Sequence, residues 1–530
     1  MDERNERNEF TDEDLSGPVV DRRTTMKLLG AAGMAGLAGC TGGGGGSGGS
    51  GGGANGSGSG GKPQPGGRLS AGWFTGSVDT LDPPYISVGQ YFQVASNVFN
   101  GLVTLDKDLT VRGDLAKDWT VEGEGETIRF DLREGVKFHN GTPFTAEDVK
   151  YTIERTIKNE TPAAEKLSTL PALIYLTRGP GRAATIVNQE AIEKMGQEQY
   201  SVTPVGTGPF QVTSHNVGSG ITLDAFGEYF GTDEDGTQLP YLDGIDIKPI
   251  PEPATLVSAL RGGDVDFSNL VPLQNVSQIE KATEVKKLQA PGVNWYGFAM
   301  NQEREPFGSR KARRGIAKLI NNEQFVETAY FGNAIPARGP INKATEWVWR
   351  ENKPDDQAYA PEQGKKLVEE AGASGASFSI LTTQDSLRPA KAMRQQLTRA
   401  GFDASVEQVT SSTYWERYEN LDYDTTISGS VGDPDPDQSL WNFYRSDGPW
   451  NWVSYEDEKV NQWLAQQRRE LDRSERAKTL QKIEDRLIAD TPSAYLSHRD
   501  DIAARRSNVK GFTHIPYMRN FHTVWLEGSP

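Results

Sequence analysis

The sequence predicts an α/β protein built on a mixed sheet, because helical and extended patterns alternate along its second half. Strands are expected where apolar runs lie between turn signals, at 378–381, 404–409 and 425–427. Helices are expected between them, over 361–371 and 390–400, each ended by a glycine. Two long amphipathic helices are expected to follow, at 457–469 and 474–489. Alternation of this kind is typical of βαβ units whose helices cover a sheet.

The first half of the chain carries its own local signals. An alternating pattern predicts a strand at 68–74, and a hairpin is expected over 119–132. Thr145 is the expected N-cap of a helix, and Asp148 occupies the matching capping-box position. Three apolar residues then follow at helical spacing: Val149, Ile153 and Ile157.

Composition limits the function classes. The chain has 530 residues and a formal charge of −17, with 73 acidic against 56 basic residues. An acidic balance argues against nucleic acid as a partner, because binding phosphates needs a basic face. The five histidines are scattered and match no metal-binding or catalytic motif, so we expect no metal, no cofactor and no enzymatic activity. A single cysteine cannot form an internal disulfide.

The N-terminal segment reads as an export and anchoring signal. Arg22 and Arg23 precede a short apolar run at 28–38, which ends at the only cysteine, Cys40. The arginine pair resembles a twin-arginine signal, and Leu-Ala-Gly-Cys resembles a lipoprotein lipobox. A Gly/Ser-rich linker at 41–67 follows, with a mean reach of about 30 Å. We therefore expect an exported protein held by lipid on Cys40 to the outer face of the cytoplasmic membrane.

The body of the chain resembles a known family over 68–530. The longest matching block runs from 115 to 150 and includes Leu-Arg-Glu-Gly-Val-Lys-Phe-His-Asn-Gly-Thr-Pro-Phe-Thr-Ala-Glu-Asp-Val. Three further blocks follow in the family's order, at 204–210, 239–245 and 259–266. These blocks resemble the family 5 solute-binding proteins, the dipeptide- and oligopeptide-binding receptors of ABC importers. The chain departs from the family's pattern between Arg155 and Ile186, so the smaller subdomain is expected to be trimmed there.

The resemblance implies a periplasmic-binding-protein-like fold with two hinged lobes and an extra small subdomain on the first lobe. It also implies a monomer that captures peptides and delivers them to membrane permease subunits. The expected divisions are an export signal, a linker, a first lobe with its small subdomain, a second lobe and a C-terminal return to the first lobe. In that order they span 1–40, 41–67, 68–290 (subdomain about 106–200), 291–504 and 505–530.

The same resemblance implies a ligand site at 427–437. By position in the family's pattern, Gly429 and Val431 would supply main-chain hydrogen bonds, and Asp433 would meet the α-ammonium group of a peptide. Such a contact is a charge-assisted hydrogen bond, about twice as strong as a neutral one. The alternative for Asp433 is a turn residue before Pro434.

Tryptophans crowd the second lobe and leave the ligand class open. Trp415 and Trp441 are candidate ligand-binding residues within a run of five tryptophans spanning 415–463. Their rings could line a pocket for apolar peptide side chains or stack on sugars, or they could simply pack in the core. An oligosaccharide receptor of the same fold is therefore the alternative to a peptide receptor. An exported hydrolase is a weaker alternative, because no nucleophile–base pair is visible.

Overall fold

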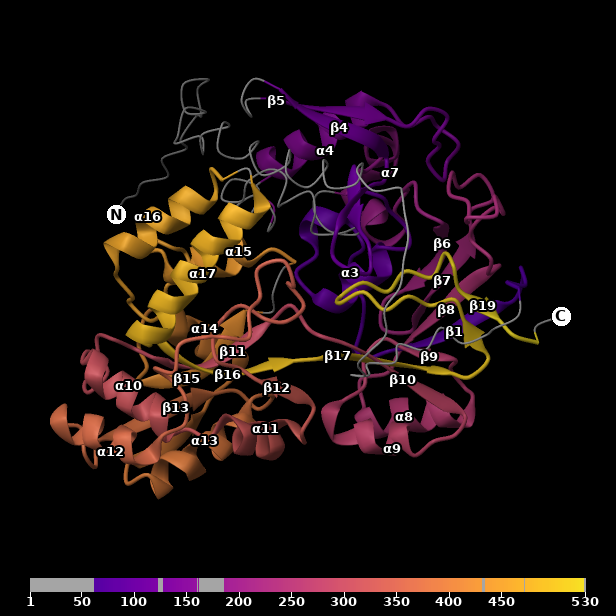
Figure 1. Cartoon of the computed structure of the whole chain (residues 1–530). Helices are drawn as coiled ribbons and strands as arrows, with labels where there is room; N and C mark the ends of the chain where they lie inside the picture. The colour runs from indigo at the N-terminus through magenta and orange to yellow at the C-terminus, as the bar shows by residue number, and fades with distance from the viewer. Residues whose placement is uncertain are drawn as a thin grey trace, which may run out of the picture.

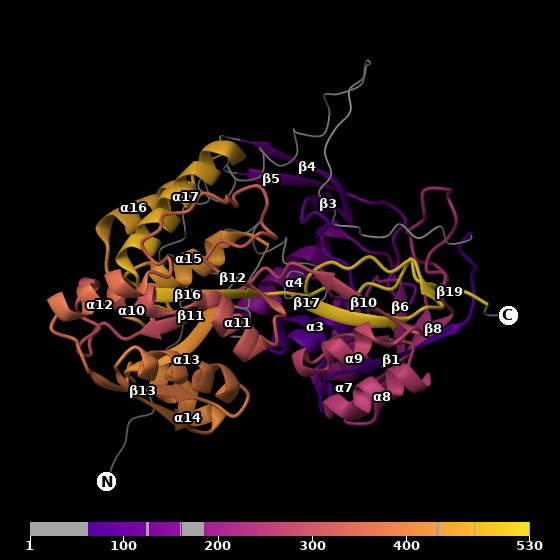
Figure 2. The same ribbon diagram turned by 60° about the horizontal axis from the view of Figure 1, so that its bottom comes forward.

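The computed structural model divides into two large lobes that lie side by side (Figure 1). Each lobe is built around one sheet, and Figure 2 shows that the two lobes are joined by extended chain near the middle of the molecule. None of the described helices is long and apolar enough to cross a membrane. The structure describes residues 62–122, 127–159, 161, 185–430, 434–470 and 472–528.

The first lobe contains a seven-stranded sheet in the order β10-β17-β9-β1-β8-β7-β6. The strands are β1 (Arg68–Trp73), β6 (Phe210–Asn216), β7 (Gly220–Ala225), β8 (Gly244–Pro249), β9 (Phe267–Ser268), β10 (Val285–Ala290) and β17 (Asp501–Arg506). The accompanying helices are η3 (Pro83–Tyr85), α3 (Gly89–Ala95), α7 (Gln189–Val202), α8 (Pro253–Gly262), η5 (Leu273–Asn275) and α9 (Val276–Glu280). Central strand β1 places Leu69, Ala71 and Trp73 in the core with no exposed surface, which confirms the predicted strand.

The second lobe contains a six-stranded sheet in the order β12-β16-β11-β15-β13-β14. The strands are β11 (Trp295–Met300), β12 (Ala334–Pro336), β13 (Ser377–Thr382), β14 (Asp403–Gln408), β15 (Thr425–Ser430) and β16 (Ser493–Arg499). The helices are α10 (Arg310–Leu319), α11 (Asn322–Tyr330), α12 (Pro361–Glu370), α13 (Leu387–Arg399), α14 (Ser411–Glu419), α15 (Pro436–Tyr444), α16 (Glu458–Gln467) and α17 (Arg473–Asp490). All the helices and strands predicted for this half are present, so the α/β alternation is confirmed.

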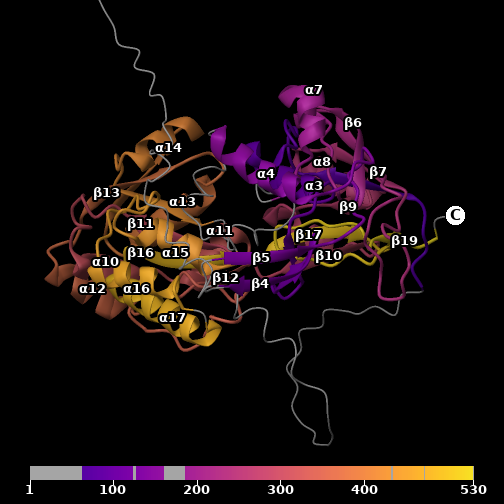
Figure 3. The same ribbon diagram turned by 90° about the horizontal axis from the view of Figure 1, so that it is seen from above.

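Strand β11 separates two apolar cores because successive side chains on a strand point to opposite faces. Phe298 and Met300 pack with α10, α11 and α13 on one face. Trp295 and Ala299 pack with α15, α16 and α17 on the other. Figure 3 shows α16 and α17 on one side of this lobe and α13 and α14 on the opposite side.

A small subdomain extends from the first lobe and has its own apolar cluster. Its strands and helix are β2 (Val103–Leu105), β3 (Val111–Gly113), β4 (Ala116–Glu122), β5 (Thr127–Leu132) and α4 (Ala146–Lys158). Thr145 and Asp148 form the predicted capping box at the start of α4. Ile153 and Ile157 are 39% and 50% exposed, so the apolar spacing on α4 does not mark its buried side. Buried Arg155 instead donates to Asp82 at 3.0 Å. The segment expected to be trimmed lies mostly outside the described residues.

The described part of the chain crosses between the lobes twice. It passes from β10 to β11 between Ala290 and Trp295, and it returns where β16 gives way to β17 at Asp501 (Figure 1). The expected boundary after residue 504 therefore falls inside β17, a first-lobe strand. The return crossing has no turn or linker signal in the sequence, because β16 and β17 follow each other with only one residue between them. Beyond it, β18 (Val509–Lys510) and β19 (Trp525–Leu526) pair on the first lobe.

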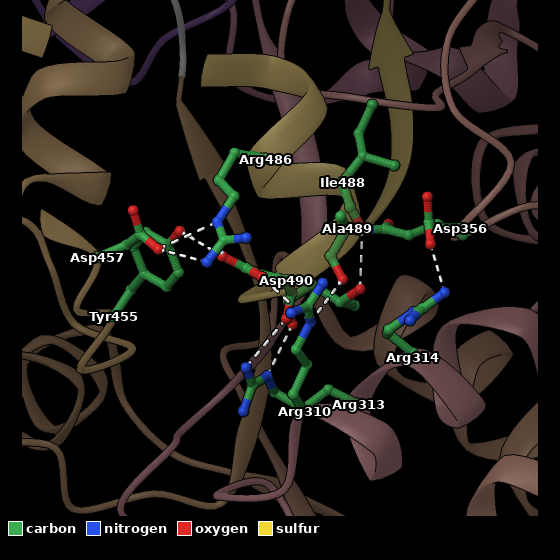
Figure 4. A network of polar contacts seen from close by, with 12 residues as sticks. Arg310, Arg313, Arg314, Asp356, Tyr455, Asp457, Arg486, Ile488, Ala489 and Asp490 are labelled. Atoms are coloured by element: carbon green, nitrogen blue, oxygen red, sulfur yellow. Dashed lines mark hydrogen bonds and ion pairs between the residues drawn. The ribbon is translucent and has the colours of Figure 1, made fainter. Parts of the chain in front are cut away.

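A network of arginines fixes the start of the returning strand (Figure 4). Buried Arg313 donates to the main-chain oxygens of Asp490 and Thr491, each at 3.0 Å, just before β16 begins. Arg310 lies 3.1 Å from the Asp490 carboxylate. Cations are favoured at the carboxyl end of a helix, here α17. Burial lowers the pKa of Arg313 to about 10, which leaves it charged at neutral pH.

Candidate ligand site between the lobes

In the first lobe, the carboxyl ends of the parallel strands face the crossings. Strands β1, β8 and β9 run parallel and end at Trp73, Pro249 and Ser268. Strand β17 runs antiparallel to β9 and enters the sheet at Asp501, directly from the second lobe. The carboxyl end of β9 therefore lies toward the crossing, and those of β1 and β8 share this edge.

The second lobe presents the matching edge. Strands β13, β14 and β15 run parallel and end at Thr382, Gln408 and Ser430. Ser430 pairs with Trp295, the first residue of β11 after the other crossing. In open α/β sheets, ligands bind outside the carboxyl ends of the strands. The topology thus puts two such edges against the crossings and makes the space between the lobes the candidate site.

The first-lobe edge is held by a buried polar chain. The Phe74 amide, just after β1, donates to Asn269 Oδ1 at 2.7 Å. Asn269 Nδ2 donates to Gln93 Oε1 at 2.8 Å, and its main-chain oxygen accepts from Arg519 Nε at 2.9 Å. Arg519 also pairs with Asp501 at 2.7 Å. Because each of these buried groups has a partner, this edge is fixed in shape.

Gly429 lies where the resemblance predicts contact with a ligand main chain. It pairs with Tyr296 of β11 on one side of β15. A Cβ atom here would lie 1.9 Å from the main-chain oxygen of Trp295, so only glycine fits. On the other side, β13 pairs with β15 at Thr425 and Thr426 only. Among the described strands, residues 427–429 thus have no ladder partner on that side.

Five predicted residues fall outside the part of the chain that the structure describes. Val431 and Asp433 lie outside the described residues, as do Cys40, Arg22 and Arg23. The described chain resumes at Pro434, shortly before α15.

Buried ion pairs fix the start of α15. Asp435 caps this helix and pairs with Arg476 at 2.6 Å. Burial raises the pKa of Asp435, but Arg476 outweighs this effect and lowers it overall. Asp437 pairs with Arg468 at 2.7 Å. Arginine contacts thus account for these two aspartates, and no metal-binding cluster exists within the described residues.

The two candidate tryptophans have different surroundings. Trp415 on α14 is 47% exposed and contacts Trp452 edge to face at 5.8 Å. The same cluster reaches β15, because the Tyr418 hydroxyl donates to Ser428 Oγ at 2.7 Å. Trp441 on α15 lies under two guanidinium groups, those of Arg445 and Arg468, at 4.3 and 3.3 Å from its ring centre. The structure thus connects Trp415 to Ser428 of β15 through Tyr418, and it engages Trp441 within the lobe.

A basic cavity of about 590 Å³ lies between α11 and α13, and sequence reasoning missed it. Its cations are Arg388, Lys391 and Arg394 of α13, and Gln384 at its rim accepts a 2.9 Å hydrogen bond from Gln408 at the end of β14. The cavity therefore opens near the carboxyl edge of the sheet. None of the three cations pairs with a carboxylate in the described part of the chain. A signal was available, since 386–399 contains four cations and no acidic residue.

Comparison with known proteins identifies the family. The model for bacterial extracellular solute-binding proteins, family 5 (middle part), matches residues 110–451. The chain belongs to this family. It is thus a solute-binding protein rather than an enzyme, which confirms the resemblance in the sequence and excludes the hydrolase alternative.

Related proteins agree with this assignment. Glutathione-binding protein GsiB of Escherichia coli (strain K12) is 26% identical over 480 residues, which cover 82% of this chain and 90% of the relative. The structure of DppA from Helicobacter pylori with the peptide STSA matches with a TM-score of 0.74 and 22% identity, covering 88% of this chain and 99% of that one. AppA from Bacillus subtilis with a nonapeptide gives 0.71 and 21%, covering 88% and 100%. These structures confirm the two-lobed fold of a family 5 solute-binding protein.

Proposed function

We propose that this family 5 protein is the receptor of an ABC importer and captures di- or oligopeptides, or compounds built like them, between its lobes. The observation that carries the proposal is the side of β15 at 427–429, beside the crossing, that has no ladder partner among the described strands. An extended peptide can add to such an edge through main-chain hydrogen bonds, which leaves its side chains free. The names of GsiB, DppA and AppA, which refer to glutathione or to bound peptides, are consistent with this ligand class.

The surroundings of that edge suit the two ends of a peptide. Asp433 follows β15 and would receive the α-ammonium group. The basic cavity at Arg388, Lys391 and Arg394 would receive an anionic group of the same ligand. Exposed Trp415 would pack against a ligand side chain. A ligand bound to both lobes favours the closed arrangement, because it has more contacts there.

The N-terminal segment supplies the proposed location. Arg22 and Arg23 would direct export, and lipid on Cys40 would hold the protein at the outer face of the membrane beside its permease. Replacing Cys40 with Ser should release folded protein into the medium. A Cys40→Ser protein that still sediments with membranes would rule out the lipid anchor.

An oligosaccharide is the second candidate ligand, favoured by one observation. Trp415 and Trp452 form a partly exposed aromatic corner close to β15, and such rings can stack on sugar faces. In a sugar receptor, Trp415→Ala would abolish binding and Asp433→Asn would have little effect, because neutral hydroxyl groups do not require a carboxylate.

The test is calorimetric titration with peptides of two to five residues, their N-acetylated forms and cello-oligosaccharides. Asp433→Asn should weaken peptide binding about 30-fold or more, since losing one partner of a partly buried ion pair removes at least about 2 kcal/mol. N-acetylation should weaken wild-type binding similarly and add little in the variant, because both changes remove one contact. Binding of the sugars alone would overturn the peptide proposal.

A further inference from the structure

Arg499, at the end of β16, differs from the other enclosed arginines of the protein. Among the described residues, four of the five buried arginines have carboxylate partners: Arg155 with Asp82, Arg468 with Asp437, Arg476 with Asp435 and Arg519 with Asp501. The fifth, Arg313, donates to main-chain oxygens at the end of α17. Within the described ranges, the guanidinium of Arg499 has no ion pair. It lies instead over the rings of Tyr296 and Tyr330, at 4.4 and 5.6 Å from their centres. Aromatic faces hold a cation in place without neutralising it.

Arg499 as a whole residue is half-buried, and its guanidinium group forms a hydrogen bond with the Tyr330 side chain. The residue stands at the return crossing, two positions before Asp501 of the first lobe. Its main chain is tied to the other crossing through Asn294, at 2.7 and 2.8 Å. An anion bound between the lobes can therefore contact Arg499, a residue of one crossing whose main chain is hydrogen-bonded to the other crossing.

The basic cavity is a second, separate group of unpaired cations on the same side of the lobe. Adjacent residues at the end of α11 connect the two positions, because Tyr330 lies under Arg499 and Phe331 lies under Arg388 at 3.9 Å. A single carboxylate can neutralise only one of these positions. If the lobes closed while the other position had no carboxylate partner, a cation would lose its water without gaining an ion pair, which is strongly unfavourable.

We infer that the ligand carries two carboxylates, one bound in the basic cavity and the other by Arg499. This inference rests on the proposed peptide function and narrows it to peptides with an acidic side chain or a γ-glutamyl group. An arginine suits the role because its planar guanidinium can donate two parallel hydrogen bonds to one carboxylate. Arg499 would then act as a specificity residue that is engaged when the lobes close.

The test compares matched tripeptides with free ends by calorimetry. The probes are Glu-Ala-Ala, Ala-Glu-Ala and Ala-Ala-Glu, their glutamine counterparts, and glutathione. At one position at least, the wild type should prefer glutamate over glutamine by about 30-fold or more. Arg499→Gln should reduce that preference to within about threefold while leaving the affinity for the glutamine peptide nearly unchanged. Arg388→Gln should weaken both peptides of the pair by a similar factor, because both keep their terminal carboxylate.

Two further variants complete the design. Arg304→Gln is the matched control, since Arg304 is a surface residue paired with Asp422 at 3.4 Å, and it should change nothing. Arg499→Lys keeps the charge but loses the paired donors, so the preference should persist at a lower value. If Arg499→Gln does not fold, a preference in Arg499→Lys within twofold of the wild type overturns the inference.

The remaining outcomes separate this inference from the proposed function. Wild-type binding of glutamine peptides without any preference for glutamate overturns the two-carboxylate inference and leaves the peptide function standing. If Arg499→Gln loses affinity equally for the glutamate and the glutamine peptide of a pair, Arg499 has a structural role at the crossing. This result also overturns the two-carboxylate inference. If the wild type binds none of the peptides, both claims fall together.

Discussion

Asn294 and Arg499 join the two segments that connect the lobes. Asn294 Nδ2 donates to the Arg499 main-chain oxygen at 2.7 Å, and Asn294 Oδ1 accepts from the Arg499 amide at 2.8 Å. One side chain thus satisfies both main-chain groups of a residue 205 positions away. Gly292 makes room for this contact, because a Cβ there would lie 2.1 Å from the same Arg499 oxygen. These two hydrogen bonds therefore tie the two crossings to each other.

Removing this link should loosen the crossings. We expect Asn294→Ala to lower the free energy of unfolding by about 1–3 kcal/mol, because two main-chain groups lose their buried partner. Urea denaturation of the wild type and the variant measures the change. Asn216→Ala, which alters an exposed asparagine of the first lobe, should have an effect within about 0.5 kcal/mol. Equal midpoints for the two variants would contradict the role of Asn294.

Gly429 should tolerate no side chain. Gly429→Ala would place a methyl group against the Trp295 main-chain oxygen and push β15 away from β11. We expect a loss of thermal stability and a weakening of peptide binding of at least about tenfold. Gly227→Ala is the control, because no atom lies within 4 Å of a Cβ at that position. Unchanged affinity in Gly429→Ala would show that the shape of this edge does not matter for binding.

His498 should make the protein sensitive to acid. Burial, aided by nearby Lys353, lowers the pKa of His498 to about 3, and its Nδ1–H donates to the Asn294 main-chain oxygen at 2.8 Å. Because the unfolded chain titrates near pH 6.5, the neutral side chain stabilises the fold fully above that pH. This stabilisation is lost as the pH falls from 6.5 toward 3, by up to about 1.4 kcal/mol per pH unit.

Denaturation from pH 7.5 to 5 compares wild type with His498→Gln. The variant should show a shallower loss of stability toward low pH, because glutamine does not titrate. A constant difference between the two proteins at every pH would refute the assignment.

Local features of the sequence were enough to predict much of the fold. The capping box of Thr145 and Asp148 formed as expected, since it needs only residues three apart. The buried side of α4 was not predictable, because it depends on Arg155 pairing with Asp82, which lies far away in the sequence. The return crossing near Asp501 was also not predictable, because the strand pattern of the sequence continues through it. Such features depend on how distant segments pack.

The candidate site shows the same division. Gly429 was chosen from the sequence and lies on β15 beside the crossing, whereas Trp441 binds two arginines of its own lobe. Trp415 contacts other aromatic side chains of the second lobe. Arg499 and the basic cavity were not predicted, because what distinguishes them is that their cations have no carboxylate partner among the described residues. A sequence lists charged residues but does not reveal which of them lack a neutralising neighbour in the fold.

The most direct test of peptide capture is amide hydrogen exchange along β15, with and without saturating peptide. We expect slower exchange at 427–429 in the complex, because the ligand main chain would occupy the unpaired side of the strand. Protection should be weaker in Asp433→Asn at the same peptide concentration. Calorimetric binding accompanied by unchanged exchange throughout 425–430 would contradict capture of the peptide at this edge.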